Sequence, residues 1–491
     1  MLNRYSHTVY QVQRCRVMQG YIVAALAICI VMLFLPNSAM ANAKLPGGDG
    51  SVEYQPFASY LLPMANMSED AKTDFHAARA LAHQPWVKAP ASTTARDGLG
   101  PIYNARSCLA CHINGGRGLM PNDGKQRLTQ GVVRLSVEDE KGVRAHPVYG
   151  EQLQTQSIAL AHQLNLAASL YKSEPKPEAY AYIDWQYKQY VYADGSKVEL
   201  RHPKLRLQRL AYGELGEKVR LSLRNAPPIH GVGLLEMISE KDILANQKQQ
   251  ADQGLVSGKV NRVFDPQSAQ TVIGRFGWKA NQPSVLVQTA QAFQQDIGIS
   301  NPLFTDQPCT RYEKECRQQP LGYVRNSKEP FELNNRLLQA VADFSKNLAV
   351  PKARQMGKTL SVQGDKLFKQ TGCIACHKAS YVTTEDKQFP QLSNQQIWPY
   401  SDLLVHDMGE ALADNRSDFL AGGREWRTAP LWGIGLSERV NGSHNFLHDG
   451  RARTIEEAIL WHGGEAEFSK QNFVKLTQQQ RQLLLDFIKA I

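Results

Sequence analysis

Two Cys-x-x-Cys-His pentapeptides constrain this chain more than any other feature of its sequence. They occupy residues 108–112, with the sequence CLACH, and residues 373–377, with the sequence CIACH. Two cysteines three residues apart place both sulfurs where they can form thioethers to the two vinyl groups of one porphyrin, and the next histidine then lies under the iron. The sequence therefore predicts two covalently bound c-type haems, each with iron, held by Cys108, Cys111 and His112 and by Cys373, Cys376 and His377.

Other uses of paired cysteines fit this pattern poorly. A zinc site made of two Cys-x-x-Cys halves separates them by roughly 12–20 residues, whereas Cys111 and Cys373 lie in opposite halves of the chain. A thioredoxin-like redox pair does not explain why histidine follows both pairs. Two further cysteines, Cys309 and Cys316, have no adjacent histidine and lie in a polar stretch. In an oxidising compartment, a local disulfide explains them better than a metal role does.

The first 41 residues have the pattern of a secretory signal peptide. Basic residues extend to Arg16, an apolar stretch covers the fifteen residues 21–35, and small residues follow at 39–43. An uncleaved anchor is the alternative, although a spanning helix needs roughly 20 apolar residues. No second stretch of membrane length follows. We expect a periplasmic protein with no integral membrane domain after cleavage of the leader.

The charge pattern gives little support to a nucleic-acid partner. The chain has 56 Lys and Arg against 46 Asp and Glu, a formal net charge of +10. These charges are spread along the sequence without Lys/Arg runs, unlike the basic patches that bind nucleic acids. The charge predicts at most a mild attraction to acidic proteins.

Hydrophobic periodicity predicts a mainly α fold of two cytochrome c-like domains, the first enlarged by β-hairpin insertions. Helical patterns cover residues 68–82, 332–348 and 362–369. Residues 130–137 and 187–200 alternate with period two, the latter around an Ala-Asp-Gly turn, and are expected to form hairpin strands.

A weak internal repeat places the domain boundary near residue 350. After each haem motif comes an Ala-Pro segment ending in Gly-x-Gly-Leu, at 224–236 and at 427–438, and then a Gly-Arg pair and a helix. The same order of pieces in both halves predicts two related domains that face each other. We expect the N-terminal haem domain to cover residues 42–350 and the C-terminal haem domain to cover residues 351–491.

At three segments the chain resembles the di-haem oxidoreductase family of peroxidase-like proteins. This family belongs to the superfamily of bacterial di-haem cytochrome c peroxidases and of the di-haem enzyme that matures methylamine dehydrogenase. The segments are 224–236 (RNAPPIHGVGLLE), 399–410 (PYSDLLVHDMGE) and 447–465 (LHDGRARTIEEAILWHGGE). The resemblance to the narrower family covers nearly all of the mature chain. The similarity to the peroxidases is confined to the haem motifs and short pieces around each pocket.

The resemblance implies a distal ligand for the second haem. In the peroxidases, a His-x-Gly stretch leads into a helix whose end supplies a methionine to the iron. The stretch beginning at His448 is similar here, and His462 takes the position of that methionine. A histidine at the end of a helix in the same half as a haem motif is also a reasonable ligand in itself. Met408 is the rival candidate.

The resemblance also implies a reactive first haem. The peroxidases leave this iron open and place a glutamate, within Glu-Met-Gly, over it. Asp296-Ile-Gly is similar here, with the shorter aspartate. Because a carboxylate beside the iron can move a proton between peroxide oxygens, we assign Asp296 and the nearby Gln288 as catalytic residues. The tryptophan between the haems of the relatives is replaced by residues 272–275, so either Trp278 substitutes for it or electrons take another path.

The first function hypothesis is an exported di-haem c-type cytochrome oxidoreductase, a peroxidase. It would pass electrons from one haem to a peroxide- or substrate-reactive haem. Its partners would be a small redox donor protein, a cytochrome or cupredoxin, and a small-molecule oxidant such as hydrogen peroxide. The absence of a histidine matching His462 in residues 285–292 favours this hypothesis. The alternatives are a non-catalytic electron-transfer cytochrome, with His230 as the candidate ligand of the first iron, and a haem-based sensor or an accessory protein for iron acquisition.

Overall fold

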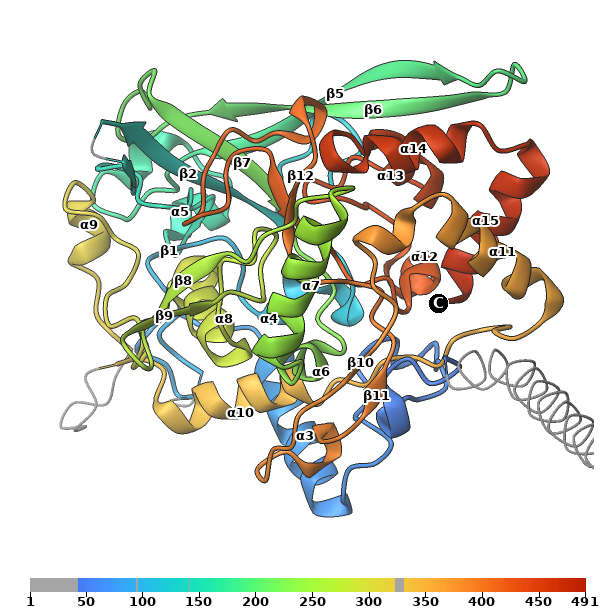
Figure 1. Ribbon diagram of the computed structural model, residues 1–491. Helices are drawn as coiled ribbons and strands as arrows, with labels where there is room; N and C mark the ends of the chain where they lie inside the picture. Colours follow the sequence, from blue (N-terminus) through green and yellow to red (C-terminus); the bar gives the residue numbers. More distant parts are fainter. Residues whose placement is uncertain (1–42, 94–95, 141, 323–330) are drawn as a thin grey trace, which may run out of the picture.

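The fold is mixed, which corrects the expectation of a mainly α protein. The computed structural model describes residues 43–491 apart from 94–95, 141 and 323–330, so the predicted leader lies outside the described residues (Figure 1). The structure is 32% helix and 19% strand, with several small antiparallel sheets. Many of these strands are two or three residues long, too short to produce a periodic hydrophobic pattern. Within the described ranges, no helix is long and apolar enough to cross a membrane.

Three predicted helices are confirmed. Helix α3 (Glu69–His83) begins after Ser68, whose hydroxyl accepts a hydrogen bond from the backbone N–H of Ala71. It packs against α10 (Asn335–Lys346), whose apolar stripe also contacts α8 (Val285–Ala292). Helix α11 (Thr359–Gln370) covers the predicted segment 362–369 and leads into the second haem motif.

The first haem motif coincides with a single helical turn, α4 (Cys108–Cys111), and the second with a 3-10 turn, η5 (Cys373–Ala375). The other described α-helices are α5 (Leu160–Gln163), α6 (Val232–Glu236), α7 (Glu240–Gln253), α9 (Lys314–Arg317), α12 (Ser437–Asn441), α13 (Ile455–Trp461), α14 (Glu467–Val474) and α15 (Gln478–Ala490). Short 3-10 turns lie at Gly48–Gly50, Ile113–Gly115, Ala168–Tyr171, Pro390–Leu392, Glu410–Leu412, Ile434–Leu436 and Gly464–Ala466.

The strands pair only in antiparallel fashion within the described sheets. Strand β2 (Gly131–Asp139) lies between β3 (Gly142–Arg144) and β7 (Val219–Asn225), which confirms the strand predicted at 130–137. The smaller pairs are β1 (Ile102–Tyr103) with β4 (Gln156–Ser157), β8 (Arg262–Asp265) with β9 (Gln270–Ile273), β10 (Tyr381–Val382) with β11 (Gln396–Ile397), and β12 (Val405–Asp407) with β13 (Glu425–Arg427).

The predicted hairpin at 187–200 is confirmed, but it is much longer. Its strands are β5 (Tyr180–Val191) and β6 (Lys197–Gln208), and Figure 1 shows them lying above α13 and α14. Contacts between side chains on opposite strands stabilise the parts of the hairpin in which polar and apolar residues do not alternate. For example, the Arg206 guanidinium lies 4.8 Å from the centroid of the Tyr182 ring directly opposite.

This hairpin comes from the first half of the chain and binds the second half. Arg201 Nε donates to the carbonyl oxygen of Arg451 at 3.0 Å, and the Tyr192 hydroxyl donates to Glu456 at 2.8 Å. The Arg481 guanidinium donates to the Asp194 carboxylate at the hairpin turn at 2.7 Å. The main hydrophobic core likewise contains residues from both halves. The division into 42–350 and 351–491 stays a prediction.

The repeated segments have matching local structure. Gly231 and Gly433 both adopt left-handed backbone conformations, with φ of 72° and 68°, immediately before a helical turn. Helices α8 and α13 both begin after a hydroxyl side chain, Ser284 or Thr454, that caps the third N–H of the helix. The two segments therefore share local backbone conformation and helix capping, and the relation between the two halves stays a prediction.

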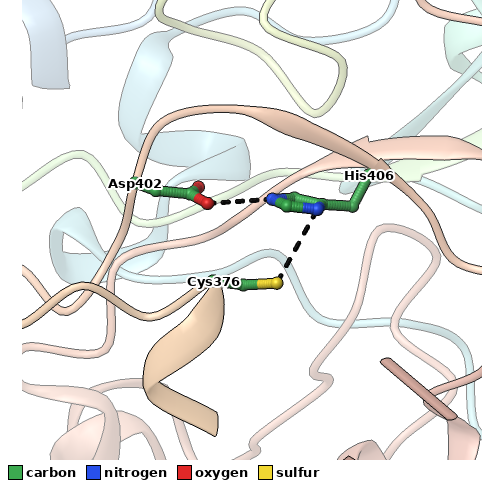
Figure 2. Close-up of side chains that lie close together, drawn as sticks. All are labelled: Cys376, Asp402 and His406. Atoms are coloured by element: carbon green, nitrogen blue, oxygen red, sulfur yellow. Dashed lines mark hydrogen bonds and ion pairs between the residues drawn. The ribbon is translucent and has the colours of Figure 1, made fainter. Parts of the chain in front are cut away.

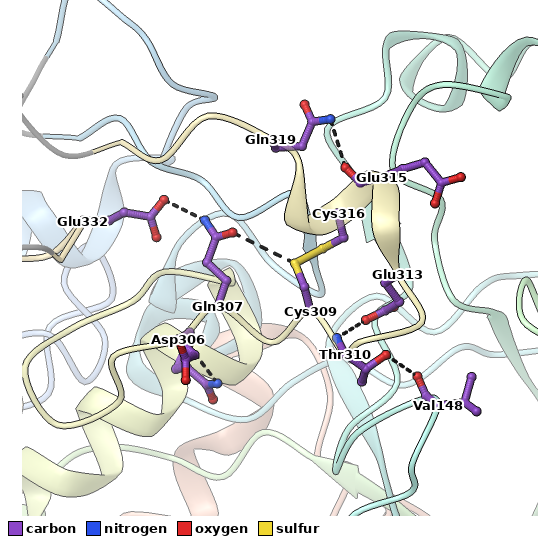
Figure 3. The surroundings of a disulfide bond; sticks show 11 residues. Val148, Asp306, Gln307, Cys309, Thr310, Glu313, Glu315, Cys316, Gln319 and Glu332 are labelled. Atoms are coloured by element: carbon purple, nitrogen blue, oxygen red, sulfur yellow. Dashed lines mark hydrogen bonds between the residues drawn. A yellow bond between two sulfur atoms is a disulfide. The ribbon is translucent and has the colours of Figure 1, made fainter.

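The predicted disulfide between Cys309 and Cys316 is present (Figure 3). It closes a loop that contains most of α9 and the buried side chain of Glu313. The Thr310 hydroxyl in this loop donates to the carbonyl oxygen of Val148 at 2.7 Å. The loop that the disulfide closes is therefore hydrogen-bonded to the segment that follows β3.

Candidate functional site

Each Cys-x-x-Cys-His motif lines a cavity of its own. The first cavity is enclosed by α8, the turn that follows it, and the segments around α4 and α6. The second is enclosed by the segments around α13, β12 and β13. The motif residues that line them are Cys108, Cys111 and His112 in the first cavity and Cys373, Cys376 and His377 in the second.

The two motif histidines are oriented as metal ligands. His112 Nδ1 lies 2.6 Å from the carbonyl oxygen of Pro227, and His377 Nδ1 lies 2.8 Å from that of Tyr400. When Nδ1 donates to the backbone, Nε2 keeps its lone pair for a metal. Burial lowers the pKa of both imidazoles, that of His377 to about 4. Both are therefore neutral at pH 7, as a ligand must be.

The residues present fit two c-type haems. All four motif cysteines are free thiols at a cavity wall. Burial raises their pKa values, that of Cys108 to about 12, and the Asp296 charge adds to this effect at Cys108 and Cys111. Each cavity thus combines two thiols for thioether bonds with one anchored, neutral imidazole, the donor set that covalent haem attachment requires.

His462 and Met408, the two candidates for the distal ligand, both line the second cavity. His462 follows the last residue of α13, and its Nδ1 lies 2.6 Å from the carbonyl oxygen of Ala458. It therefore has the same backbone anchor as the two motif histidines. Burial also lowers its pKa. The assignment of His462 as ligand stays a prediction.

Asp296 and Gln288, the predicted catalytic residues, both line the first cavity. Asp296 belongs to a π-helical turn (Phe293–Ile297) that continues α8, a form of helix often found at functional sites. Gln152 Nε2 donates to Asp296 Oδ1 at 2.7 Å. Burial raises the pKa of Asp296, although the Gln152 hydrogen bond and the Arg134 charge oppose that rise.

Gln152 and Arg134 were not predicted from the sequence. Gln152 is 144 positions away from Asp296, and no motif surrounds either residue. Only the period-two pattern of the strand at 130–137 pointed to this part of the chain. Both side chains line the first cavity beside Asp296.

The two cavities share one wall. Trp278, the candidate to replace the tryptophan that lies between the haems of the relatives, is part of this wall. Its Nε1 donates to the carbonyl oxygen of Asn225 at 2.8 Å. An aromatic side chain therefore does lie between the cavities. The residues that line both cavities, called the shared wall below, are Arg117, Trp278, Arg427, Ala429, Pro430 and Ile434.

His230, the alternative ligand of the first iron, lines the first cavity. Its Nε2 lies 3.2 Å from the carbonyl oxygen of Trp432, and its ring centroid is 4.1 Å from that of Tyr60. In the part of the chain that the structure describes, its Nδ1 has no hydrogen-bond partner. Burial lowers the pKa of His230 to about 4.

A cluster of metal-ligand types beside the second cavity is better explained as an ionic network. Figure 2 shows His406 between Asp402 and Cys376, and its Nε2 lies 2.9 Å from Asp402 Oδ2. Its Nδ1 lies 2.8 Å from Glu465 Oε2. Burial alone would lower the pKa of His406, but hydrogen bonds to Asp402, Cys376 and Glu465 raise it well above its ordinary value. A protonated imidazole has no lone pair for a metal, and it instead ties β12 to the second haem motif.

Comparison with known proteins supports the resemblance found in the sequence. A family model described as "Di-haem oxidoreductase, putative peroxidase" matches residues 42–491. No curated protein matches the chain.

Proposed function

The chain belongs to the di-haem oxidoreductase family, and from this premise we propose that it is an exported, periplasmic c-type cytochrome peroxidase. The second haem receives electrons from a small donor protein, a cytochrome or cupredoxin, and the first uses them on hydrogen peroxide or a related oxidant. In this proposal residues 42–350 and 351–491 form two cytochrome c-like domains. The observation that carries the proposal is the Asp296 carboxyl group in the first cavity, beside the cysteines of the first haem motif.

When bound, the haems supply irons that exchange electrons and, at an open coordination position, bind peroxide. His112 and His377 hold these irons from one side, and their bonds to backbone carbonyls increase the electron-donating power of Nε2. In the second cavity, His462 would serve as a second ligand of the haem iron. Helix α8 of the first cavity holds no histidine at the corresponding place, so a haem there would keep a coordination position for peroxide.

Asp296 is the proposed acid and base for the proton of hydrogen peroxide. Gln152 donates to Asp296 Oδ1, so Oδ2 would be available to accept a proton from one oxygen of hydrogen peroxide and pass it to the other. Burial raises the pKa of this carboxyl group, which strengthens it as a base and lets it hold the proton between the two transfers. Gln288 provides a polar contact in the same cavity.

Electrons cross between the cavities through the shared wall. Trp278 is 8% exposed and is fixed by its bond to Asn225, so its ring keeps one position between the two sites. It takes the place of the tryptophan that the sequence lacks at residues 272–275.

The test compares Asp296→Asn with Asp306→Asn, an exposed aspartate ten positions away. Rapid mixing of the holoprotein with hydrogen peroxide is followed by haem absorbance, and peroxide consumption is measured with a reduced donor. The Asp296 variant should react about 10²- to 10⁴-fold more slowly, the usual contribution of general acid–base catalysis. The Asp306 variant should match the wild type. A wild type that does not react with peroxide in any redox state would rule out the proposed function.

A second candidate function is electron transfer without catalysis. The observation that favours it is the unpartnered Nδ1 of His230 on the wall of the first cavity, among the described residues. Electron paramagnetic resonance of the ferric protein decides between the two functions. One high-spin and one low-spin iron support the peroxidase, and two low-spin irons support the electron carrier.

A further inference from the structure

The cationic side chains around the two cavities are mostly neutralised by carboxylates of the protein. This pairing is expected, because a buried charge is strongly destabilising unless an opposite charge or hydrogen bonds compensate it. The paired cations are Arg134 with Glu151 at 3.2 Å, Arg224 with Asp418 at 2.6 Å, and Lys470 with Glu467 at 2.5 Å.

Two cations of the shared wall are exceptions. Arg117 and Arg427 have no carboxylate within ion-pair distance among the residues that the structure describes. Arg427 donates only to neutral backbone oxygens, those of Gly277 at 3.0 Å and Thr428 at 3.1 Å. Both side chains line both cavities.

Arg117 is the more extreme case. Its side chain is 5% exposed, and neither Nε nor Nη1 has a hydrogen-bond partner in the described part of the protein. The guanidinium lies 5.2 Å from the centroid of the Phe446 ring, which cannot neutralise it. Burial lowers the pKa of Arg117 only to about 10, so it keeps its charge at pH 7. A buried guanidinium whose N–H groups have no acceptors indicates that an anionic ligand binds at Arg117.

The chemistry of the two cavities identifies this anion. A haem that is attached through its vinyl groups keeps its propionate carboxylates, and a guanidinium is well suited to bind a carboxylate through two parallel hydrogen bonds. We infer that Arg117, with Arg427 in the same shared wall, binds a propionate of each haem and so raises the reduction potentials of both. This inference depends on the two-haem part of the proposed function but not on its peroxide chemistry.

The sign of the effect on the two reduction potentials follows from the charge of Arg117. A positive charge close to both haems disfavours oxidation of either iron, because oxidation adds a positive charge. Its removal should therefore make both haems easier to oxidise and lower both potentials. A unit charge at about 10 Å in a medium of effective dielectric about 20 changes each oxidised-to-reduced ratio on the order of tenfold. A tenfold change corresponds to about 59 mV for a one-electron couple.

The experiment is a spectroelectrochemical titration of the holoprotein without peroxide. We compare the wild type with Arg117→Gln and with Arg424→Gln, which removes an exposed guanidinium paired with Asp407. We expect both potentials to fall in the Arg117 variant, and neither to move in the Arg424 variant. A change at one haem alone, or at neither haem while both remain bound, overturns the inference.

Two further measurements keep the result interpretable. If Arg117→Gln loses haem during maturation, Arg117→Lys replaces it, and both potentials should then shift in the same direction by a smaller factor. Wild-type potentials that depend on whether the buffer anion is chloride or sulfate would assign Arg117 an exchangeable inorganic anion and overturn the inference. Shifted potentials in a protein inert to peroxide would support the inference and contradict only the proposed function.

Discussion

The buried carboxyl groups of Glu178 and Glu313 make the stability of the fold depend on pH. Glu178 and Glu313 are 1% and 0% exposed, and burial, followed by the charge of Glu313, raises the pKa of Glu178 well above its usual range. The backbone N–H of Gln154 donates to Glu178 Oε2 at 2.5 Å, and that of Thr310 donates to Glu313 Oε2 at 2.5 Å. Because burial penalises the charged form of a carboxyl group, this pair favours holding a proton in the folded chain.

The size and sign of the effect follow from the pKa of Glu313. Burial raises this pKa from 4.5 to about 7. The folded chain therefore holds a proton that the unfolded chain releases at lower pH. The stabilisation is fully present below about pH 4.5 and is lost as the pH rises through about 7. At about 1.4 kcal/mol per pKa unit, it amounts to about 3 kcal/mol.

The assay is urea unfolding of the holoprotein between pH 5 and pH 8 with the disulfide intact. Glu313→Gln keeps a neutral group that can both donate and accept hydrogen bonds. The free energy of unfolding of the wild type minus that of this variant should fall by about 2.5 kcal/mol between pH 5 and pH 8, because part of the full effect is already lost at pH 5. Buried histidines with lowered pKa values, such as His448, give the opposite slope, but they are common to both proteins and cancel.

Glu315→Gln is the comparison variant, because Glu315 lies in the same disulfide loop, is only partly buried, and contributes by its charge to the raised pKa of Glu313. The pH dependence should persist in this variant, slightly reduced, whereas it should disappear in Glu313→Gln. Parallel profiles for the wild type and the Glu313 variant would refute the reasoning, because they would show that this carboxyl group has the same pKa in the folded and unfolded chains.

Three further predictions concern the haems and the disulfide. Cys373→Ala should halve the covalent haem in a pyridine haemochrome assay, because it breaks one attachment motif, and retention of both haems would exclude that motif. His462→Ala should convert one low-spin ferric signal to high-spin by removing a strong ligand, and an unchanged spectrum would indicate Met408 instead. Replacing Cys309 and Cys316 by serine should lower the free energy of unfolding by about 2–3 kcal/mol, since the short loop is no longer closed. Equal urea midpoints for this variant and the wild type would contradict that estimate.

The sequence was most informative where chemistry acts between neighbours along the chain. Each haem motif needs its cysteines and histidine in one short segment, so the spacing of these residues alone indicated two haem sites. Helix α3 was predicted from the helical pattern over residues 68–82, which is a local signal. The Cys309–Cys316 bond joins residues only seven positions apart and followed from elimination.

The features that the sequence did not predict depend on tertiary packing, which local sequence patterns do not reveal. Arg117 lies between two glycines in an unremarkable loop. Its proposed role as an anion-binding residue follows only from the structure, in which Arg117 lines both cavities and two of its N–H groups have no acceptors among the described residues. Gln152 contacts Asp296 only because the segment after β3 packs against the π-helical turn. Short strands such as β12 form from contacts distant in sequence, which explains why the helical content was overestimated.

The β5–β6 hairpin also limits how this protein can be divided or recombined. Arg201 on β6 supplies donors to the carbonyl oxygens of Gly450 and Arg451, and Asp194 at the hairpin turn binds Arg481. A gene fragment encoding residues 351–491 alone would leave these buried groups facing solvent without partners. A chimera with a homologue would need the hairpin and the second half from the same parent. These two segments, although separated along the chain, are therefore expected to be inherited as one unit.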